Sequence, residues 1–370
     1  MSAAAPADAR PLARGLGAAT LGLALGALLL ARRPATRGPA PVPPSLPLPH
    51  RPARAETNAN ANANANADAD DGMAAPRTAP SEPADAALPA RRLYQAAALL
   101  AASVLSDSAL EHYRGDFENP GMFAPLASAA VVLACALRGA WTPARRGRAP
   151  THRPAPRTSA GILSGVPYAT ACAVGVAGLG FHAYNVLRRP GGLSWANLFY
   201  AAPLGAPAAL ALAGVIGLAA RPVAAGAPTL AGLPSGRALC GLAAFGLAGT
   251  SAEAALLHFR GAFQHPAMWV PVSVPPVTAV MLAGAALPGA PGRRRLTNAL
   301  LRACTWLGVL GMGFHARGIA RQMGGWRNWS QNVLAGPPLP APPSFSALAL
   351  AGRAALALRA AQEGWPREAT

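Results

Sequence analysis

The sequence predicts an all-α integral membrane protein made of two tandem repeats of four transmembrane helices, about eight spans in all. Apolar residues make up 52% of the 370 residues and charged residues only 12%, which is too apolar for an ordinary soluble domain. Apolar runs of spanning length recur along the chain, and the second set of four repeats residues of the first. Because four spans return the chain to its starting side, we expect a pseudo-twofold axis along the membrane normal.

The amino-terminal region is predicted to lie outside the repeats. Residues 1–33 hold an apolar stretch with arginines on both sides, which is typical of a signal anchor, a signal peptide or a low-complexity apolar segment. The arginines at its end favour an uncleaved anchor. Residues 34–90 are rich in Ala, Pro and Asn and include the run ETNANANANANADADD. This linker has few apolar side chains to bury and is predicted to be disordered.

Eight apolar runs follow the linker. At 1.5 Å per residue, about 20 helical residues cross a hydrocarbon layer of roughly 30 Å. The expected spans are Leu93–Leu110, Pro120–Leu137, Ile162–Val186, Leu198–Ala220, Ala238–Leu257, Pro266–Leu287, Ala299–His315 and Val333–Leu358.

The internal repeat is clearest where the first two spans of each half meet. The segment ALEHYRGDFENPGMFAPL aligns without a gap to ALLHFRGAFQHPAMWVPV, at an offset of 258 − 112 = 146. GLGFHAYNVLRRPGG aligns to GMGFHARGIARQMGG at 315 − 182 = 133, and the prolines that follow align at 338 − 203 = 135. We therefore predict two four-helix repeats, at residues 91–225 and 236–360.

The arginines predict the orientation of the chain. Arginine clusters at residues 138–157 and 289–298 lie between the second and third spans of each half, so both loops are expected in the cytoplasm. The repeated motifs then face outward from the cell membrane, most simply a bacterial inner membrane. The net charge of +18 is spread in short clusters between apolar runs, which argues against nucleic acid as a partner.

Two pairs of histidines are matched by the repeat. His112 and His258 end the first span of each half, and His182 and His315 lie near the end of the third. An ionisable residue in a span is by default a candidate functional residue. Three interpretations remain open: hydrogen bonds that fix helix contacts, ligation of haem b or a transition metal, and proton or solute handling.

Other polar residues surround these histidines in the alignment. Asp107 and Glu253 correspond, because 253 − 107 = 146, and Arg114 or Arg260 is a candidate counter-ion for them or for haem propionates. A structural ion pair and a proton relay both fit the acids. If the histidines are ligands, Asn197 and Asn332 are expected to accept hydrogen bonds from their other ring nitrogens.

The repeated motif HxRGxFxxPxM predicts a tight turn. Gly115 and Gly261 are expected at positive φ after the first helix, and Asn119 before Pro120 is expected to cap the next helix, with His265 as the cap in the second half. The methionines of this motif lie near the histidines but pack more often than they ligate. The Gly-x-Gly-Phe-His segments predict a close helix contact, or an approach by a flat cofactor.

The four cysteines lie in apolar runs without CxxC spacing and are interpreted as packing residues. No HExxH, Walker or nucleophile-elbow motif is present. The leading functional hypothesis is a membrane redox protein that binds haem or metal through the paired histidines, with the lipid bilayer and a membrane or exported redox protein as partners. The alternatives are a small-solute or proton-coupled transporter and a non-catalytic anchor for an exported enzyme.

Overall fold

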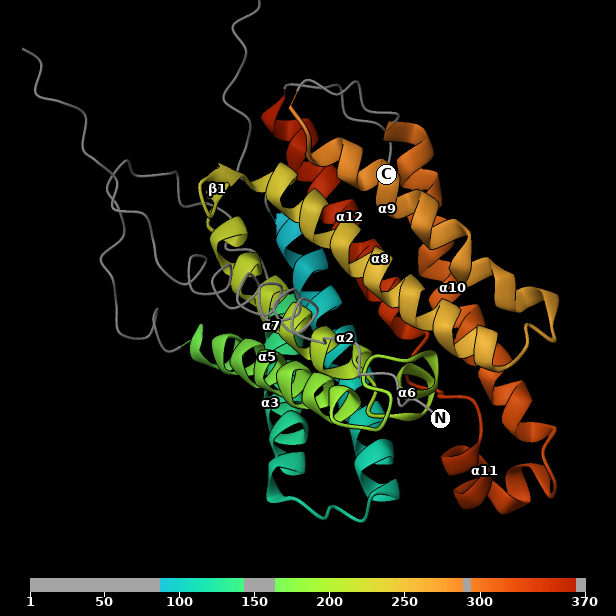
Figure 1. Cartoon of the computed structure of the whole chain (residues 1–370). Coiled ribbons are helices and arrows are strands. Elements are labelled where there is room, and N and C mark those ends of the chain that lie inside the picture. The colour runs from blue at the N-terminus through green and yellow to red at the C-terminus, as the bar shows by residue number, and fades with distance from the viewer. Residues whose placement is uncertain (1–86, 143–163, 289–293, 364–370) are drawn as a thin grey trace, which may run out of the picture. The chain divides into compact units, whose positions relative to one another are not determined.

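The computed structural model describes residues 87–142, 164–288 and 294–363. Within these ranges the chain is helical apart from turns and one two-stranded hairpin, which confirms the all-α class (Figure 1). Residues 1–33 and most of the predicted linker lie outside the described residues. The linker prediction was wrong at its end, because α2 begins at Ala87 rather than after residue 90.

Each half contains four long helices together with short helical segments. Those of the amino-terminal half are α2 (Ala87–Arg114), η2 (Pro120–Met122), α3 (Phe123–Trp141), α5 (Val166–Leu187), α6 (Trp195–Tyr200) and α7 (Gly205–Ala224). Those of the carboxy-terminal half are α8 (Ser235–Arg260), η3 (Pro266–Val272), α9 (Val274–Ala286), α10 (Arg294–Ala320), η4 (Gly325–Asn328), α11 (Trp329–Ala335) and α12 (Pro343–Gln362). The strands β1 (Thr229–Leu230) and β2 (Leu233–Pro234) form an antiparallel hairpin between the halves. Its turn residues Ala231 and Gly232 have φ of 50° and 82°, as tight hairpin turns require.

Six helical segments in the described ranges are long and apolar enough to cross a membrane: α2, η2 with α3, α5, α7, α8, and η3 with α9. These lengths and compositions indicate a multi-pass membrane protein. The remaining long helices, α10 and α12, have 27 and 20 residues. They are less apolar because α10 carries Arg294, Arg295 and Arg302, while α12 carries Arg353 and Arg359.

The fourth and eighth predicted spans are not continuous helices. The run Leu198–Ala220 is divided into α6 and α7 beside Pro203, and the run Val333–Leu358 is divided into α11 and α12 by a proline-rich segment. Proline has no backbone N–H to donate and disfavours a helical conformation in the residue before it. The long helix after each break therefore begins afresh, at Gly205 and Pro343.

The helices α7 and α12 form the interior of the bundle. Helix α7 packs against α2 and α5, while α12 packs against α8, α10 and also α2. Every residue from Leu210 to Ala220 is buried, as is every residue from Ser344 to Ala349. The helices around them expose large apolar side chains, including Val280 and Trp306, which suits a surface in contact with lipid.

Glycines set the closest crossings between helices. A Cβ atom on Gly175 of α5 would lie 2.4 Å from the Ala211 nitrogen and 2.6 Å from the Pro207 oxygen of α7. The matched glycine of α10, Gly308, would meet the Pro342 oxygen at 2.9 Å. At Gly175 the neighbours are backbone atoms, which cannot rotate away; at Gly308 the Ser346 side-chain oxygen is nearest, at 2.2 Å, with backbone atoms at 2.9 and 3.0 Å. The third helix of each half therefore approaches the fourth closely enough to exclude any side chain.

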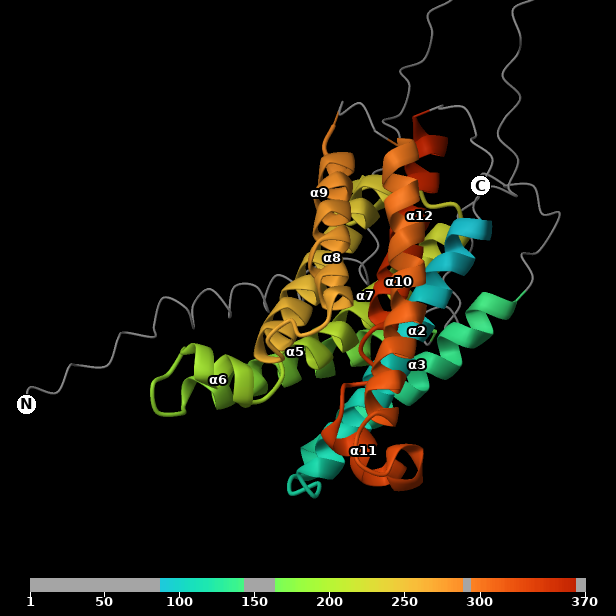
Figure 2. The same cartoon turned by 90° about the vertical axis from the view of Figure 1, so that its right-hand side faces the viewer.

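The two ends of the bundle differ in structure. The α2–α3 turn, α6 and α11 lie at one end, whereas the hairpin and the last turn of α12 lie at the other (Figures 1 and 2).

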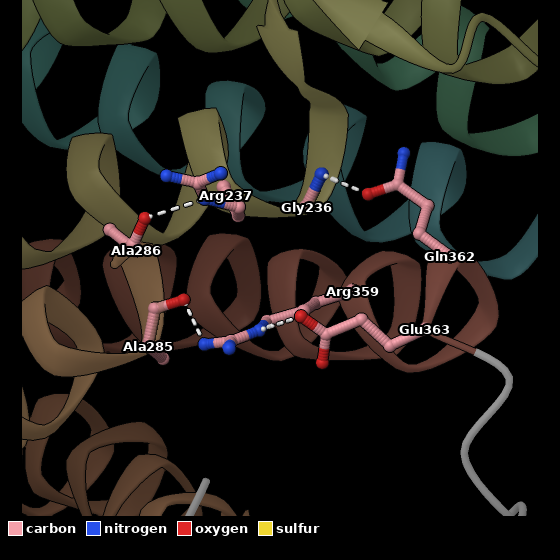
Figure 3. A network of polar contacts seen from close by, with 7 residues as sticks. All are labelled: Gly236, Arg237, Ala285, Ala286, Arg359, Gln362 and Glu363. Carbon is pink, nitrogen blue, oxygen red and sulfur yellow. Dashed lines mark hydrogen bonds and ion pairs between the residues drawn. The ribbon is translucent and has the colours of Figure 1, made fainter. Parts of the chain in front are cut away.

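A polar network joins α8, α9 and α12 at the hairpin end (Figure 3). Arg359, only 2% exposed, donates hydrogen bonds to the Ala285 carbonyl and to Glu363. Arg237 donates to the Ala286 carbonyl at 2.8 Å, so both arginines supply partners to the last carbonyls of α9.

Candidate functional site

The first two histidines occupy identical settings in the two halves. His112 Nδ1 lies 2.8 Å from the Met122 carbonyl oxygen, and His258 Nδ1 lies 2.8 Å from the Met268 carbonyl oxygen. In each half the imidazole ties the end of the first helix to the start of the second. The side chain of Phe117 or Phe263 meets the imidazole edge-on, with 6.2 Å between ring centroids in both halves.

The turn that carries these histidines differs in detail from the prediction. Gly261 has φ of −83° and Gly115 is not at positive φ; the left-handed residues are the next two, Asp116 with Phe117 and Ala262 with Phe263. A Cβ at these glycines would lie 3.5–3.6 Å from the preceding carbonyl oxygens, an ordinary contact distance, and at Gly261 it would also lie 3.1 Å from Met268 Cε. The turn is therefore made by two non-glycine residues in the left-handed conformation. The glycine in the motif marks the turn but not the residues that adopt positive φ.

The predicted caps are confirmed. Asn119 accepts a hydrogen bond from the Gly121 nitrogen at 2.8 Å, and His265 Nδ1 accepts one from the Ala267 nitrogen at 3.1 Å. Because Nδ1 of His265 is an acceptor, its neutral ring carries the proton on Nε2. His265 therefore differs in tautomer from the motif histidines.

The second two histidines bond to the breaks between helices. His182 Nδ1 contacts the Pro203 carbonyl oxygen between α6 and α7, and His315 Nδ1 lies 2.7 Å from the Pro338 carbonyl oxygen between α11 and α12. The residues four positions further on, Pro207 and Pro342, have no N–H to give a helical hydrogen bond to these carbonyls. Each histidine supplies a donor, and the Pro338 carbonyl also accepts from the Ala341 nitrogen at 3.3 Å.

These contacts determine the tautomer of all four histidines. A carbonyl oxygen can only accept, so each neutral ring carries its proton on Nδ1 and its lone pair on Nε2. Among the described residues, the four Nε2 atoms have no hydrogen-bond partner, and none of them is fully buried.

The two histidines of each half are near enough to interact electrostatically. His182 interacts with His112, and His315 interacts with His258. The fourth helix brings them together, because α7 packs against both α2 and α5, and α12 against both α8 and α10.

Asn197 and Asn332 do not accept from the histidines, so that prediction was wrong. The amide of Asn197 donates to the carbonyls of Pro190 and Gly192, and that of Asn332 donates to Met323 and Gly325. Each asparagine therefore fixes the loop that precedes its own short helix, α6 or α11. The histidines find backbone acceptors instead, and backbone groups carry no sequence signal.

The two carboxylates have different partners. Glu253 Oε1 accepts from the Gly205 nitrogen at 3.0 Å, at the start of α7. A Cβ atom on Gly205 would lie 1.6 Å from Glu253 Oε2, so only glycine leaves space for this carboxylate. Asp107 lies within range of the charge of Glu253, and within the described ranges it makes no hydrogen bond or ion pair.

Neither motif arginine is an ion-pair partner of these acids. Arg114 pairs with Glu111 at 2.7 Å on the exposed side of α2. Arg260 donates to the Phe199 carbonyl at 2.9 Å and lies over the Tyr200 ring, 5.4 Å from its centroid. It thereby caps the end of α6 and holds this amino-terminal helix against α8.

The described residues contain no group of three or more His, Cys, Asp or Glu side chains that could hold a metal ion. An ion bound by three or four protein ligands does not fit these ranges. A haem needs only two axial ligands from the protein, so the histidine pairs fit that group better. The cysteines are free and mostly buried, in agreement with a packing role.

No protein-family model, curated protein or solved structure matches this chain.

Proposed function

We propose that the chain crosses the membrane eight times as two copies of one four-helix unit. The arginines of α10 and α12 set those helices apart from the six apolar segments. The position of α12 inside the bundle supports its inclusion as a span, since a helix surrounded by protein does not need an apolar surface. Arg359 makes its hydrogen bonds within that interior.

Matched contacts support the duplication. The histidine bonds, the asparagine bonds and the left-handed pairs recur at aligned positions. The glycine crossings also correspond: Gly217 approaches Tyr168, and the aligned Gly352 approaches the aligned Leu301. Such agreement between distant segments is expected when two copies keep one architecture.

We infer that the histidines bind haem b, which makes the protein a membrane electron carrier. The observation that carries this proposal is the common tautomer of His112, His182, His258 and His315. A hydrogen bond from Nδ1–H to a backbone carbonyl is the usual support of an imidazole that ligates through Nε2. One pair in each half gives two sites, and a redox partner in the membrane or outside the cell would exchange electrons with them.

The bonds from Nδ1 also serve the fold, since they close the turn after α2 or α8 and the break before α7 or α12. That role uses one nitrogen of each ring and leaves the other open. The same imidazole can therefore hold the helix ends and bind a cofactor, with Arg114 and Arg260 at the same end as candidates to neutralise propionates.

Optical absorption tests this function directly. The protein purified from membranes is expected to show a Soret band with about two haems per chain. The substitution His182→Ala removes a ligand from the first site only, so haem content is expected to fall to about half. Combining it with His315→Ala is expected to abolish the band.

His265→Ala is the matched control, because His265 lies at the same end and uses its Nδ1 as an acceptor. This variant is expected to keep its full haem content. Wild-type protein without a Soret band, made in cells supplied with haem, would exclude haem ligation.

The positive-inside rule supports an orientation with the arginine-rich loops in the cytoplasm and the histidines near the outer face. Single cysteines test it, in a chain whose native cysteines are replaced. Glu118→Cys is expected to react with an impermeant maleimide in intact cells, while Arg148→Cys reacts only after lysis. The reverse pattern would invert the topology.

A proton-coupled carrier is the second candidate, and one observation favours it. Asp107 and Glu253 come from opposite halves, lie within range of each other's charge and differ in their partners. A carboxylate without a partner inside a membrane protein is typical of proton pathways. A carrier of this kind needs no haem, so the absorption spectrum also separates the two functions.

A further inference from the structure

Three arginines from three helices gather in the half of the bundle opposite the histidines. Arg92 of α2 lies within range of the charges of Arg302 in α10 and Arg353 in α12, and the last two are within range of each other. Helix α12 packs against both α2 and α10, so the helices that carry the three arginines are neighbours through α12 (Figure 2).

This cluster, named here the arginine triad, has no acidic partner in the described part of the chain. None of its three members forms a hydrogen bond or ion pair there. Helix α10 contains no acidic residue, and the carboxylate that follows α12, Glu363, is bound to Arg359. The three like charges therefore repel one another without an acid to offset them.

The depth of the triad makes this repulsion costly. Arg92 is five residues from the start of α2, Arg302 is eight from the start of α10, and Arg353 is nine from the end of α12. At 1.5 Å per residue, these positions lie roughly 8–14 Å inside the helix ends. Guanidinium groups at this depth need a counter-charge, because water screens them less than it does at the surface.

The exposed side of the triad is apolar. Arg302 is exposed on α10, and Trp306 and Val309 follow it on the same face, 65% and 50% exposed. Arg92 and Arg353 are partly buried beside it. A ligand here would meet positive charge nearest the end of the helix and an apolar surface beyond it.

We propose that the arginine triad binds the phosphate of an anionic phospholipid, whose acyl chains lie along the exposed face of α10. Guanidinium groups recognise phosphate through several charge-assisted hydrogen bonds. Basic sites between transmembrane helices commonly hold such headgroups. The apolar face next to Arg302 favours a lipid over free phosphate.

Lipid discs of defined composition test this proposal. The intact protein is expected to unfold at a higher temperature in discs with phosphatidylglycerol than in discs of phosphatidylcholine alone. The double variant Arg92→Gln/Arg302→Gln is expected to lose this gain, and its apparent affinity for phosphatidylglycerol is expected to fall roughly 30-fold. In phosphatidylcholine it is expected to be at least as stable as wild type, because two repelling charges are gone.

The matched control is Arg91→Gln/Arg138→Gln, which makes the same charge change at exposed positions outside the triad. In this control, phosphatidylglycerol is expected to raise the unfolding temperature as much as it does in wild type. If phosphatidylglycerol raised the unfolding temperature equally in wild type and in the triad variant, the triad would not be the lipid-binding site. A gain of the same size from inorganic phosphate in phosphatidylcholine discs would overturn the assignment to a lipid.

Discussion

Replacing Gly175 by alanine is expected to lower the free energy of unfolding by about 3 kcal/mol, because the added methyl group would meet the backbone of α7. The nearest atoms, at 2.4 and 2.6 Å, belong to Ala211 and Pro207 and cannot rotate away. The helices α5 and α7 must separate to admit the Cβ. Reversible unfolding in mixed micelles with increasing denaturing detergent measures the loss.

The control for this prediction lies on the same helix. A Cβ on Gly180 would have nothing within 4 Å, so Gly180→Ala gains helix propensity without a clash. It is expected to raise the free energy of unfolding by up to about 1 kcal/mol. If the two substitutions changed the free energy of unfolding equally, helices α5 and α7 would be farther apart in solution than in this structure.

Replacing Arg359 by alanine is expected to lower the free energy of unfolding by about 3 kcal/mol. Its guanidinium is buried and bonds to the Ala285 carbonyl and to Glu363. Removing one member of a buried charged pair typically costs about 3–5 kcal/mol, and the lower end applies because Glu363 is 30% exposed. The same micelle unfolding experiment measures the change.

Arg353→Ala provides the comparison on the same helix. Arg353 has no such bonds within the described residues, and its charge is repelled by Arg302. In detergent without anionic lipid, its removal is expected to cost less than about 1 kcal/mol. A similar loss for both arginines would mean that only the packing of the Arg359 side chain matters.

The sequence predicted what depends on local pattern. Hydrophobic runs located the helices, and the Asn119–Pro120 cap was readable because its donor lies two residues away. The alignment also matched the histidines that later proved to share one hydrogen-bonding arrangement. These features need only neighbouring residues, or a comparison of the two halves.

The contacts that were missed join segments far apart in the chain. The acceptors of the histidines are backbone carbonyls, which every residue has, so no residue type marks them. The arginine triad needs α2 beside α12, a contact between the first and last long helices. The prolines within the eighth predicted span do mark in the sequence the boundary that the structure has between α11 and α12.

The bond between Glu253 and Gly205 has an evolutionary consequence. By the alignment that pairs Pro203 with Pro338, the counterpart of Gly205 is Pro340, which has no N–H to offer a carboxylate. Its carbonyl instead accepts from Ser103. Under the proposed duplication, each of these two matched positions has therefore changed in at least one copy. A change of Gly205 to the proline of its counterpart would now remove the N–H that Glu253 accepts from.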